Sequence, residues 1–278
     1  MSWVAIAKKD VQDSVRSRTL WALIAVFLLL IVLLANLVVP GDISDTATLL
    51  AAISGTFLFG ILFFVPLMGL IISIKSVVRE RESGTINLLL ALPHSRRDLV
   101  LGKFVGRSIV LSIAIVATFL PATLYILVQA DITPIFEMFA FLLSTILFGM
   151  MFVGIGVALS ALVNSETQAA ISGVVIFFLL YLWPVIFDQL GISISDFVAR
   201  FWLFSMFIDM LLALFSLRHS DIPNASLVAW DNAQIDEFGA ITIDVAVYMQ
   251  HWFVFIILAI WIAVPLGIGY FRFDSIDL

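Results

Sequence analysis

Arg79–Lys103, RERESGTINLLLALPHSRRDLVLGK, is the only long polar interruption between apolar segments on the side of the chain that we assign to the cytoplasm. Within it, Ile86–Leu92 (INLLLAL) is too apolar for a solvated loop. Seven helical residues span about 10 Å, whereas the hydrocarbon core of a bilayer is about 30 Å thick. The run therefore cannot cross a membrane, yet it should not face water. We expect one side to lie against the chain's own membrane helices and the other to dock a second, cytoplasmic protein.

The residues around this run carry the signals of a short helix. Glu80 and Glu82 place carboxylates ahead of the helix start, where the macrodipole favours them, and Gly84 allows a sharp change of direction. Thr85 is a suitable N-cap, and Pro93 ends the helix because the residue before a proline avoids the α region. The alternative is an ordinary basic loop that fixes the topology by charge alone.

The composition indicates a polytopic membrane protein. Of the 278 residues, 63% are hydrophobic and only 12% are charged, and the mean hydropathy is +1.17. A soluble domain of this size would expose far more charge. No polar stretch is long enough for a separate domain, so residues 1–278 are expected to form one all-α transmembrane domain. The chain has no cysteine and its three histidines are not at ligand spacing, which argues against metal catalysis.

Six segments are long and apolar enough to span a membrane. The spans are predicted at Leu20–Val39, Leu49–Ile74, Arg107–Val128, Ile135–Leu162, Ala169–Phe187 and His251–Tyr270.

Two polar stretches between the spans have predicted structures. Ser95 and Asp98 form a capping-box pattern that opens the helix after the polar loop. Asn164–Gln168 is predicted to be a short inner loop.

The N-terminus and the second span carry packing signals. Residues 1–18 show helical periodicity, with Val4 and Val11 on the apolar side, which indicates an interfacial elbow helix before the first span. A cleaved signal peptide is the competing interpretation, but the apolar run is about 20 residues long and no small-x-small cleavage site follows. The second span contains Gly60 and Gly69, which let helices approach closely in lipid and suit a subunit interface.

Phe197–Leu217 is apolar enough to suggest a seventh span, but Arg200 and Asp209 interrupt it. Ionisable groups at mid-bilayer depth are costly unless they are paired or hydrated. Ser195 and the residue after it also resemble a helix cap. We therefore predict a re-entrant or interfacial helix on the outer surface, within an outer segment at residues 188–248 between spans five and six.

The distribution of basic residues supports this topology. Of the 14 lysines and arginines, all but Arg200 and Arg218 fall on the inner side when six spans leave both termini in the cytoplasm. This is the distribution that the positive-inside rule requires. A seventh span would place Arg272 outside, so six spans agree better with the charges.

The chain lacks the motifs of an ATP-hydrolysing enzyme. No G-x-x-x-x-G-K-[ST] sequence is present, and Gly102-Lys103 lacks the preceding glycine and leads into a membrane helix. No paired carboxylates or Ser-His-Asp pattern supports intramembrane hydrolysis. If ATP drives the process, the ATPase must be a separate chain.

The polar loop resembles one family. The order E-x-E-x-G-T, an apolar run, L-P, S-R-R and L-G-K-F is similar to the loop after the second transmembrane helix of ABC-type-2 permeases. The similarity is greatest to the subfamily that includes the permease of the nitrous-oxide-reductase maturation system. The matching positions are Glu80, Glu82, Gly84, Thr85, Leu89, Leu90, Leu92, Pro93, Ser95, Arg96, Gly102, Lys103 and Phe104.

The resemblance implies a permease subunit of an ATP-driven ABC transporter at the plasma membrane, working in export. It implies that the loop is a coupling helix on a cytoplasmic ATPase subunit present in two copies, with ATP and Mg²⁺ bound there and no cofactor in this chain. A second copy of the chain and the lipid bilayer are further expected partners. The outer segment leaves room for an extracytoplasmic accessory protein, and no nucleic-acid partner is expected. The implied ATPase interface comprises Glu80, Glu82, Gly84, Thr85, Leu89, Leu90, Pro93, Arg96 and Arg97.

A self-contained secondary transporter or channel is the alternative. Such a protein would need intramembrane carboxylates or a proton relay. Five of the six predicted spans offer almost none, and Glu137 lies near the outer end of the fourth. The lack of a relay and the apolar run in the loop favour the ATP-driven transporter.

Overall fold

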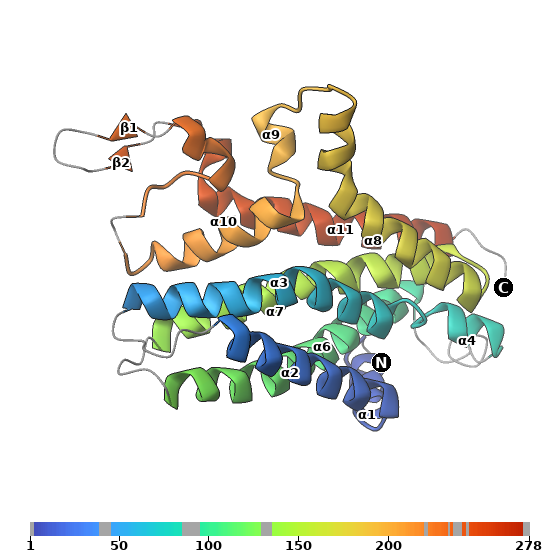
Figure 1. Ribbon diagram of the computed structural model, residues 1–278. Coiled ribbons are helices and arrows are strands. Elements are labelled where there is room, and N and C mark those ends of the chain that lie inside the picture. Colours follow the sequence, from blue (N-terminus) through green and yellow to red (C-terminus); the bar gives the residue numbers. More distant parts are fainter. Residues whose placement is uncertain are drawn as a thin grey trace.

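The computed structural model describes residues 3–38, 46–84, 95–128, 135–219, 222–232, 234–235, 241–242 and 245–274. Helices make up most of these residues (Figure 1). Two strands of two residues each, β1 (Gln234–Ile235) and β2 (Ile241–Thr242), pair antiparallel. The helices are α1 (Trp3–Val15), α2 (Arg18–Val38), α3 (Thr46–Ser73), α4 (Val78–Glu82), α6 (Arg96–Val128), α7 (Ile135–Leu162), α8 (Glu166–Gln189), α9 (Asp196–Ala199), α10 (Leu203–Phe215), η1 (Leu227–Asn232), η2 (Val247–Met249), η3 (His251–Phe253) and α11 (Val254–Asp274).

The predicted all-α polytopic membrane protein is confirmed. Within the described ranges, five stretches are long and apolar enough to cross a membrane, and the bent pair formed by α1 and α2 makes a sixth if it is counted as one span. The two helices of this pair meet at an angle of 66°. The five stretches are Gly60–Glu82, Arg96–Pro121, Ile135–Leu162, Glu166–Gln189 and His251–Phe273.

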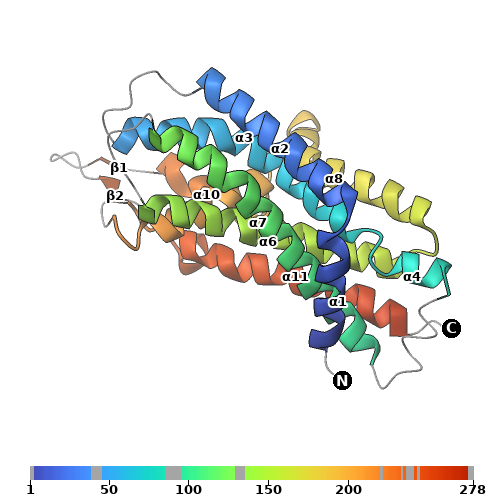
Figure 2. The ribbon, with the colours of Figure 1, turned by 90° about the horizontal axis from the view of Figure 1, so that it is seen from below.

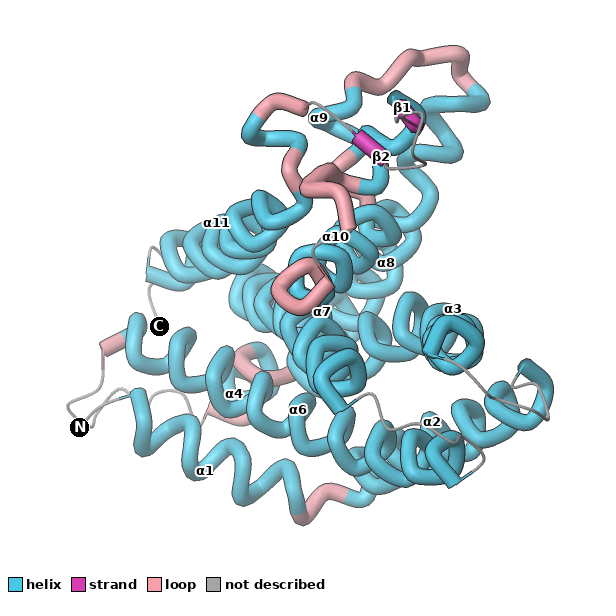
Figure 3. Tube along the Cα trace, turned by 90° about the vertical axis from the view of Figure 1, so that its left-hand side faces the viewer, coloured by secondary structure: helices cyan, strands magenta, loops and turns pink. Residues whose placement is uncertain are grey.

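Helix α7 forms the centre of the bundle. Seen along the bundle in Figure 3, it is surrounded by α3, α6, α10 and α11, and it packs against each of them. Its glycines let these helices approach closely. A side chain at Gly149 would meet Leu111 of α6 and Val65 of α3, and a side chain at Gly156 would collide with the hydroxyl of Ser73. Helix α7 has the same bounds as the predicted fourth span, Ile135–Leu162.

Gly60 and Gly69 of α3 also face the interior of this chain. A Cβ atom at Gly60 would lie 2.8 Å from Cδ1 of Ile31 in α2, and one at Gly69 would lie 3.1 Å from Cβ of Phe152 in α7. Both positions are therefore used in packing within one chain. They give no support to a subunit contact through the second span.

Helix α1 crosses the beginning of α6, and two glycines of α6 allow the two helices to lie close together. A Cβ atom at Gly102 would lie 2.8 Å from Cβ of Ile6, and one at Gly106 would lie 3.0 Å from Cβ of Asp10. The buried side of α1 includes Ile6 and Asp10, whereas Val4 of the predicted apolar stripe is 50% exposed. The predicted N-terminal helix is present, and its position in the membrane interface stays a prediction.

Helix α6 begins much earlier than the predicted third span. The Ser95 amide donates to Asp98 Oδ2 at 3.1 Å and the Asp98 amide donates to Ser95 Oγ at 3.1 Å, so the predicted capping box is formed. Leu99, in the first turn, is buried. The helix therefore begins where the capping box predicted, and the polar first turns belong to the same helix as the predicted span Arg107–Val128.

The inner loop between α7 and α8 is shorter than the predicted Asn164–Gln168. Ser165 is the N-cap of α8, and its hydroxyl accepts a hydrogen bond from the Gln168 amide at 3.2 Å. Helix α8 therefore begins at Glu166, and the polar residues assigned to the loop form its first turn.

The apolar part of the outer segment forms two short helices rather than a seventh span. Helices α9 and α10 are separated by a break at Phe201–Trp202. Helix α10 has 13 residues and is therefore about 20 Å long, too short for a hydrocarbon core of about 30 Å. It packs against α7 and α11. The rejection of a seventh span is confirmed.

The two ends of the bundle differ in chemistry. Helices α1 and α4 and the end of α11 lie at one end, whereas β1 and β2 lie at the other (Figures 1 and 2). The first end carries most of the basic side chains that were assigned to the cytoplasm. Which end of the bundle faces the cytoplasm stays a prediction.

Candidate functional site

The candidate site is the basic end of the bundle, around α4 and the beginning of α6. The predicted short helix Ile86–Leu92 lies outside the described residues, as do four of the predicted interface residues: Thr85, Leu89, Leu90 and Pro93. The structure describes the other five, which lie on the two sides of this segment: Glu80, Glu82, Gly84, Arg96 and Arg97.

Helix α4 is fastened to the end of α7 by one hydroxyl. Ser160 Oγ accepts hydrogen bonds from the amides of Val77 at 2.9 Å and Val78 at 3.0 Å, and all three residues are buried. Two amides at the beginning of a helix have no partner within it, so this contact satisfies them. The chain then turns at Gly84, whose φ of 71° lies in the left-handed region that glycine adopts without strain.

Lys103 joins three helices in a buried ion-pair cluster. Its Nζ lies 2.9 Å from Asp10 Oδ1 of α1 and 2.6 Å from Glu80 Oε1 of α4. Asp10 is shared with Arg107, whose Nε lies 2.7 Å from Asp10 Oδ2. Burial is nearly complete for Lys103 and Asp10, with 8% and 3% of their side chains exposed. Glu80, one of the predicted interface residues, is therefore part of an internal network.

Two arginines on opposite sides of residues 85–94 meet on one aromatic ring. The guanidinium carbons of Arg81 and Arg96 each lie 5.5 Å from the ring centre of Phe273, at the end of α11. Arg96 also donates to the Phe273 carbonyl at 2.6 Å. Arg97 stacks on the Tyr270 ring and donates to its hydroxyl at 3.0 Å. The two ends of the polar loop are thus held together by α11.

Arg81 also caps the end of α7. It donates to the carbonyls of Val163 at 2.7 Å and Ala161 at 3.1 Å. Cations are favourable at a helix C-terminus because its last carbonyls lack partners within the helix. Arg81 therefore connects α4, α7 and α11.

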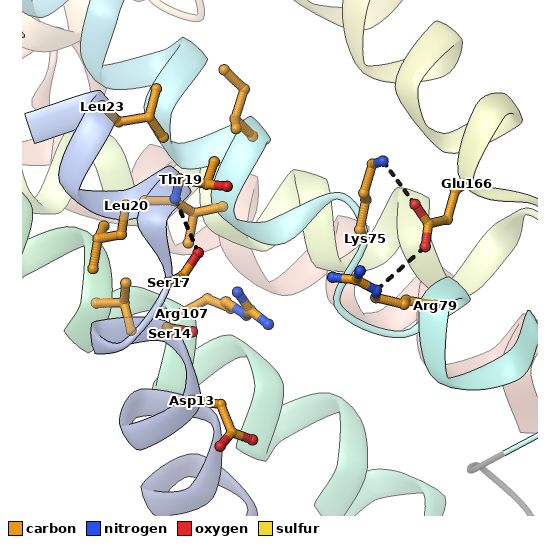
Figure 4. Close-up of a pocket in the computed structure, with 13 residues that line it drawn as sticks. Asp13, Ser14, Ser17, Thr19, Leu20, Leu23, Lys75, Arg79, Arg107 and Glu166 are labelled. Atoms are coloured by element: carbon orange, nitrogen blue, oxygen red, sulfur yellow. Dashed lines mark hydrogen bonds and ion pairs between the residues drawn. The ribbon is translucent and has the colours of Figure 1, made fainter. Parts of the chain in front are cut away.

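Glu166 anchors α4 and the end of α3 to the beginning of α8. Its carboxylate lies 2.7 Å from Lys75 Nζ and 3.5 Å from Arg79 Nε (Figure 4). Its amide donates to Glu82 Oε1 at 3.0 Å, so Glu82, like Glu80, is bound within the chain. Lys75 and Glu166 are partly exposed, so this pair contributes less than the buried Lys103 cluster.

Sequence reasoning missed the partners that position these residues. Asp10, Ser160, Glu166 and Phe273 are far from the polar loop in sequence and belong to no motif. No local sequence signal separates Asp10, which is buried, from Asp13 of the same helix, which is exposed. Pairwise contacts over such separations follow from helix packing and not from local sequence.

A second buried cluster lies in the outer segment. The side chains of Arg200 and Asp209 are both fully buried, and Nη2 of the arginine lies 3.1 Å from Oδ2 of the carboxylate. Asp209 Oδ1 accepts from the Leu227 amide at 2.7 Å, and Arg200 donates to the Tyr248 carbonyl. Burial raises the pKa of the Asp209 carboxyl to about 6, against the opposing effects of the Leu227 amide and the Arg200 charge.

Both clusters connect separate elements of the chain. The basic end joins the residues on the two sides of 85–94 to α11, and the outer pair joins α10 to η1 and η2. In the described part of the chain, no three histidine, aspartate or glutamate side chains form a group that could hold a metal ion.

Comparisons with known proteins place the chain in a family. The model of the ABC-2 family transporter protein matches residues 4–278. Two curated proteins called probable ABC transporter permease protein NosY are similar: the one from Stutzerimonas stutzeri is 31% identical over 169 residues, and the one from Pseudomonas aeruginosa is 33% identical over 171 residues. Each alignment covers 59% of this chain, and 61% and 62% of the two relatives. The chain therefore belongs to the ABC-2 family of transporter proteins.

Proposed function

We propose that two copies of this chain form the membrane part of an ATP-driven exporter and that two separate cytoplasmic ATPase subunits dock on the loop at residues 79–103. Family membership supports a permease subunit. The observation that carries the coupling proposal is that both ends of residues 85–94 are fastened to one point, the Phe273 ring. Glu80, Glu82, Arg96 and Arg97 then serve mainly to hold the loop's base.

Such a base suits the transmission of force. A displacement of the loop would act on α7 and α11 through Arg81, on α8 through Glu82, and on α1 and α6 through Lys103. These contacts are short and several are buried, so the connected helices should move together. Leu89 and Leu90 would supply the apolar contact with the ATPase, because a few buried side chains carry most of the affinity of a short docked helix.

Helix α8 is the proposed contact between the two copies. It lies at the edge of the bundle, and eight of its large hydrophobic side chains are exposed. Exposed apolar area can face lipid or a second apolar helix. Next to it an apolar groove of about 340 Å³ runs between α3 and α8. The exposed side chains are Ile171, Val174, Val175, Phe178, Leu179, Leu182, Val185 and Ile186.

The Leu89→Asp variant should release the ATPase. Aspartate would place an unpaired charge in the apolar contact, which costs more than losing the leucine. The molar mass of the detergent-purified complex, with the ATPase co-expressed, is the measurement. We expect two chains of each kind for the wild type and a dimer of permease chains alone for the variant.

Asn87→Asp is the matched control, because it adds the same charge two residues away and so on another side of a helix. It should retain the ATPase. Full ATPase recovery with Leu89→Asp would place the docking site elsewhere, and an active one-to-one wild-type complex would refute the dimer.

The proposed topology predicts labelling from opposite sides. Ser83 lies in the loop at the basic end, and Asn224 lies in the outer segment, and both are exposed. The chain has no cysteine, so single Ser83→Cys and Asn224→Cys variants each provide one reactive thiol. In intact cells, a membrane-impermeant maleimide should label Asn224→Cys, and Ser83→Cys should react only after the membrane is permeabilised. Labelling of both in intact cells would contradict the topology.

A further inference from the structure

A cavity of about 550 Å³ opens at the bend between α1 and α2 (Figure 4). Its walls come from α1, α2, the end of α3, α4, α6 and the beginning of α8. One half is apolar and includes Leu20, Leu23 and Ile71. The other half carries hydroxyl and charged groups, including Ser14 and Ser17. The cavity therefore offers both polar and apolar surface to one ligand.

Two arginines in the polar half have donors left for a ligand. Arg79 has a side chain that is 75% exposed, and its Nε is 3.5 Å from Glu166, which is longer than a good hydrogen bond. Nε and Nη2 of Arg107 contact Asp10, so the other edge of the guanidinium group faces the cavity. The two arginine side chains extend toward one another across the space in Figure 4. Guanidinium groups bind phosphate oxygens with several donors at once.

We propose that this cavity binds one anionic phospholipid, with its phosphate between Arg79 and Arg107 and its acyl chains along Leu20, Leu23 and Ile71. Basic cavities between membrane helices on the cytoplasmic side are suited to acidic headgroups. The apolar half distinguishes a phospholipid from free phosphate, because inorganic phosphate would leave that half unused.

The charged side chains that line the cavity are both basic and acidic. Lys75, Arg79 and Arg107 contribute three positive charges, and Asp13 and Glu166 contribute two negative ones. Asp10, outside the lining, already pairs with Arg107, so the preference for an anionic lipid rests on the remaining donors of Arg79 and Arg107 and not on net charge. Phosphatidylglycerol has an anionic phosphate and no cationic group, so it is the lipid that the site should prefer over phosphatidylcholine.

A lipid in this position would join the α1–α2 bend to the end of α3. Away from the cavity, α2 and α3 pack directly against each other, and the Lys103 cluster joins α1, α4 and α6. The lipid would thus complete the support of the loop's base from the bilayer side. This binding does not depend on whether the chain couples to an ATPase.

Native mass spectrometry of the full chain, purified in detergent and titrated with lipids of equal acyl chains, tests the proposal. One phosphatidylglycerol should remain bound per chain at concentrations where phosphatidylcholine does not. Arg79→Gln should weaken phosphatidylglycerol binding about fivefold, since one basic residue near a lipid phosphate is worth about 1 kcal/mol. Ile71→Trp should also weaken it by narrowing the cavity without a change in charge.

Arg16→Gln is the matched control, because Arg16 lies at the same bend but does not line the cavity. It should leave binding unchanged. Equal retention of the two lipids would overturn the proposal, as would an equal loss with Arg16→Gln and Arg79→Gln. Displacement of phosphatidylglycerol by millimolar inorganic phosphate would show a free-phosphate site instead.

Discussion

Replacing Arg200 by methionine is expected to destabilise this protein strongly. The variant leaves the fully buried Asp209 carboxylate without its cation, and breaking a buried pair from one side typically costs about 3–5 kcal/mol. The Tyr248 carbonyl also loses a donor. The midpoint of thermal unfolding in detergent, followed by tryptophan fluorescence, should fall by on the order of 10 °C.

A second substitution separates charge from packing. Asp209→Asn removes the carboxylate charge but keeps an oxygen that can accept from the Leu227 amide. The Arg200→Met/Asp209→Asn double variant should therefore recover more than half of the lost stability. If the double variant is no more stable than Arg200→Met, the packing of the arginine and not the pairing of charges determines the stability.

The loss of stability in the Arg200→Met variant should also depend on pH. Burial already raises the folded-state pKa of Asp209 to about 6, and without Arg200 one of the opposing effects is lost. A carboxyl whose pKa is higher in the folded than in the unfolded state binds more protons when folded, so stability falls as pH rises through the folded pKa. The deficit of Arg200→Met relative to wild type should be smaller at pH 5.5 than at pH 8. A deficit that does not change with pH would show that Asp209 does not titrate in this range.

The outer segment shows which features the sequence could predict. Arg200 and Asp209 argued against a seventh span because buried charges require partners, and the structure pairs these two residues with each other. Their separation of nine residues follows from the break between α9 and α10 and fits no helical spacing. The need for a partner was thus predictable from composition, whereas its identity depended on a turn that has no clear sequence signal.

Local signals predicted helix ends better than apolar periodicity did. The Ser95–Asp98 capping box is visible in residues three apart, and it marks the real beginning of α6. The predicted third span begins later, at Arg107, because hydropathy detects only the part of a helix that lipid can cover. The inner loop predicted at Asn164–Gln168 was too long for the same reason, since Glu166 belongs to the first turn of α8.

The polar loop shows the limit of a family pattern. Glu80, Glu82 and Arg96 match the family, and the resemblance implies contact with an ATPase. In the structure Glu80 binds Lys103, Glu82 binds the beginning of α8, and Arg96 binds the end of α11. A pattern records which residues occur together but not whether they face a partner or their own chain. Whether they also contact an ATPase stays a prediction.

Replacing Lys103 by methionine should loosen the base of this loop. Lys103 lies between Asp10 and Glu80, and its ammonium group is almost fully buried. Its loss leaves Asp10 with Arg107 and removes the ion pair that binds α4 to α6. We expect a loss of about 3 kcal/mol, at the lower end for a broken buried pair because Arg107 still compensates Asp10. Recovery of the co-expressed ATPase should fall together with the unfolding midpoint.

Lys75→Met is the matched comparison, because it breaks the Lys75–Glu166 pair at the same end of the bundle. In that pair 49% and 27% of the two side chains are exposed, and exposed ion pairs contribute about 1 kcal/mol or less. Glu166 also keeps Arg79 nearby, so the unfolding midpoint and the ATPase recovery should change little. Equal losses in the Lys103→Met and Lys75→Met variants would mean that overall positive charge at this end, and not the buried connection between α1, α4 and α6, holds the loop in place.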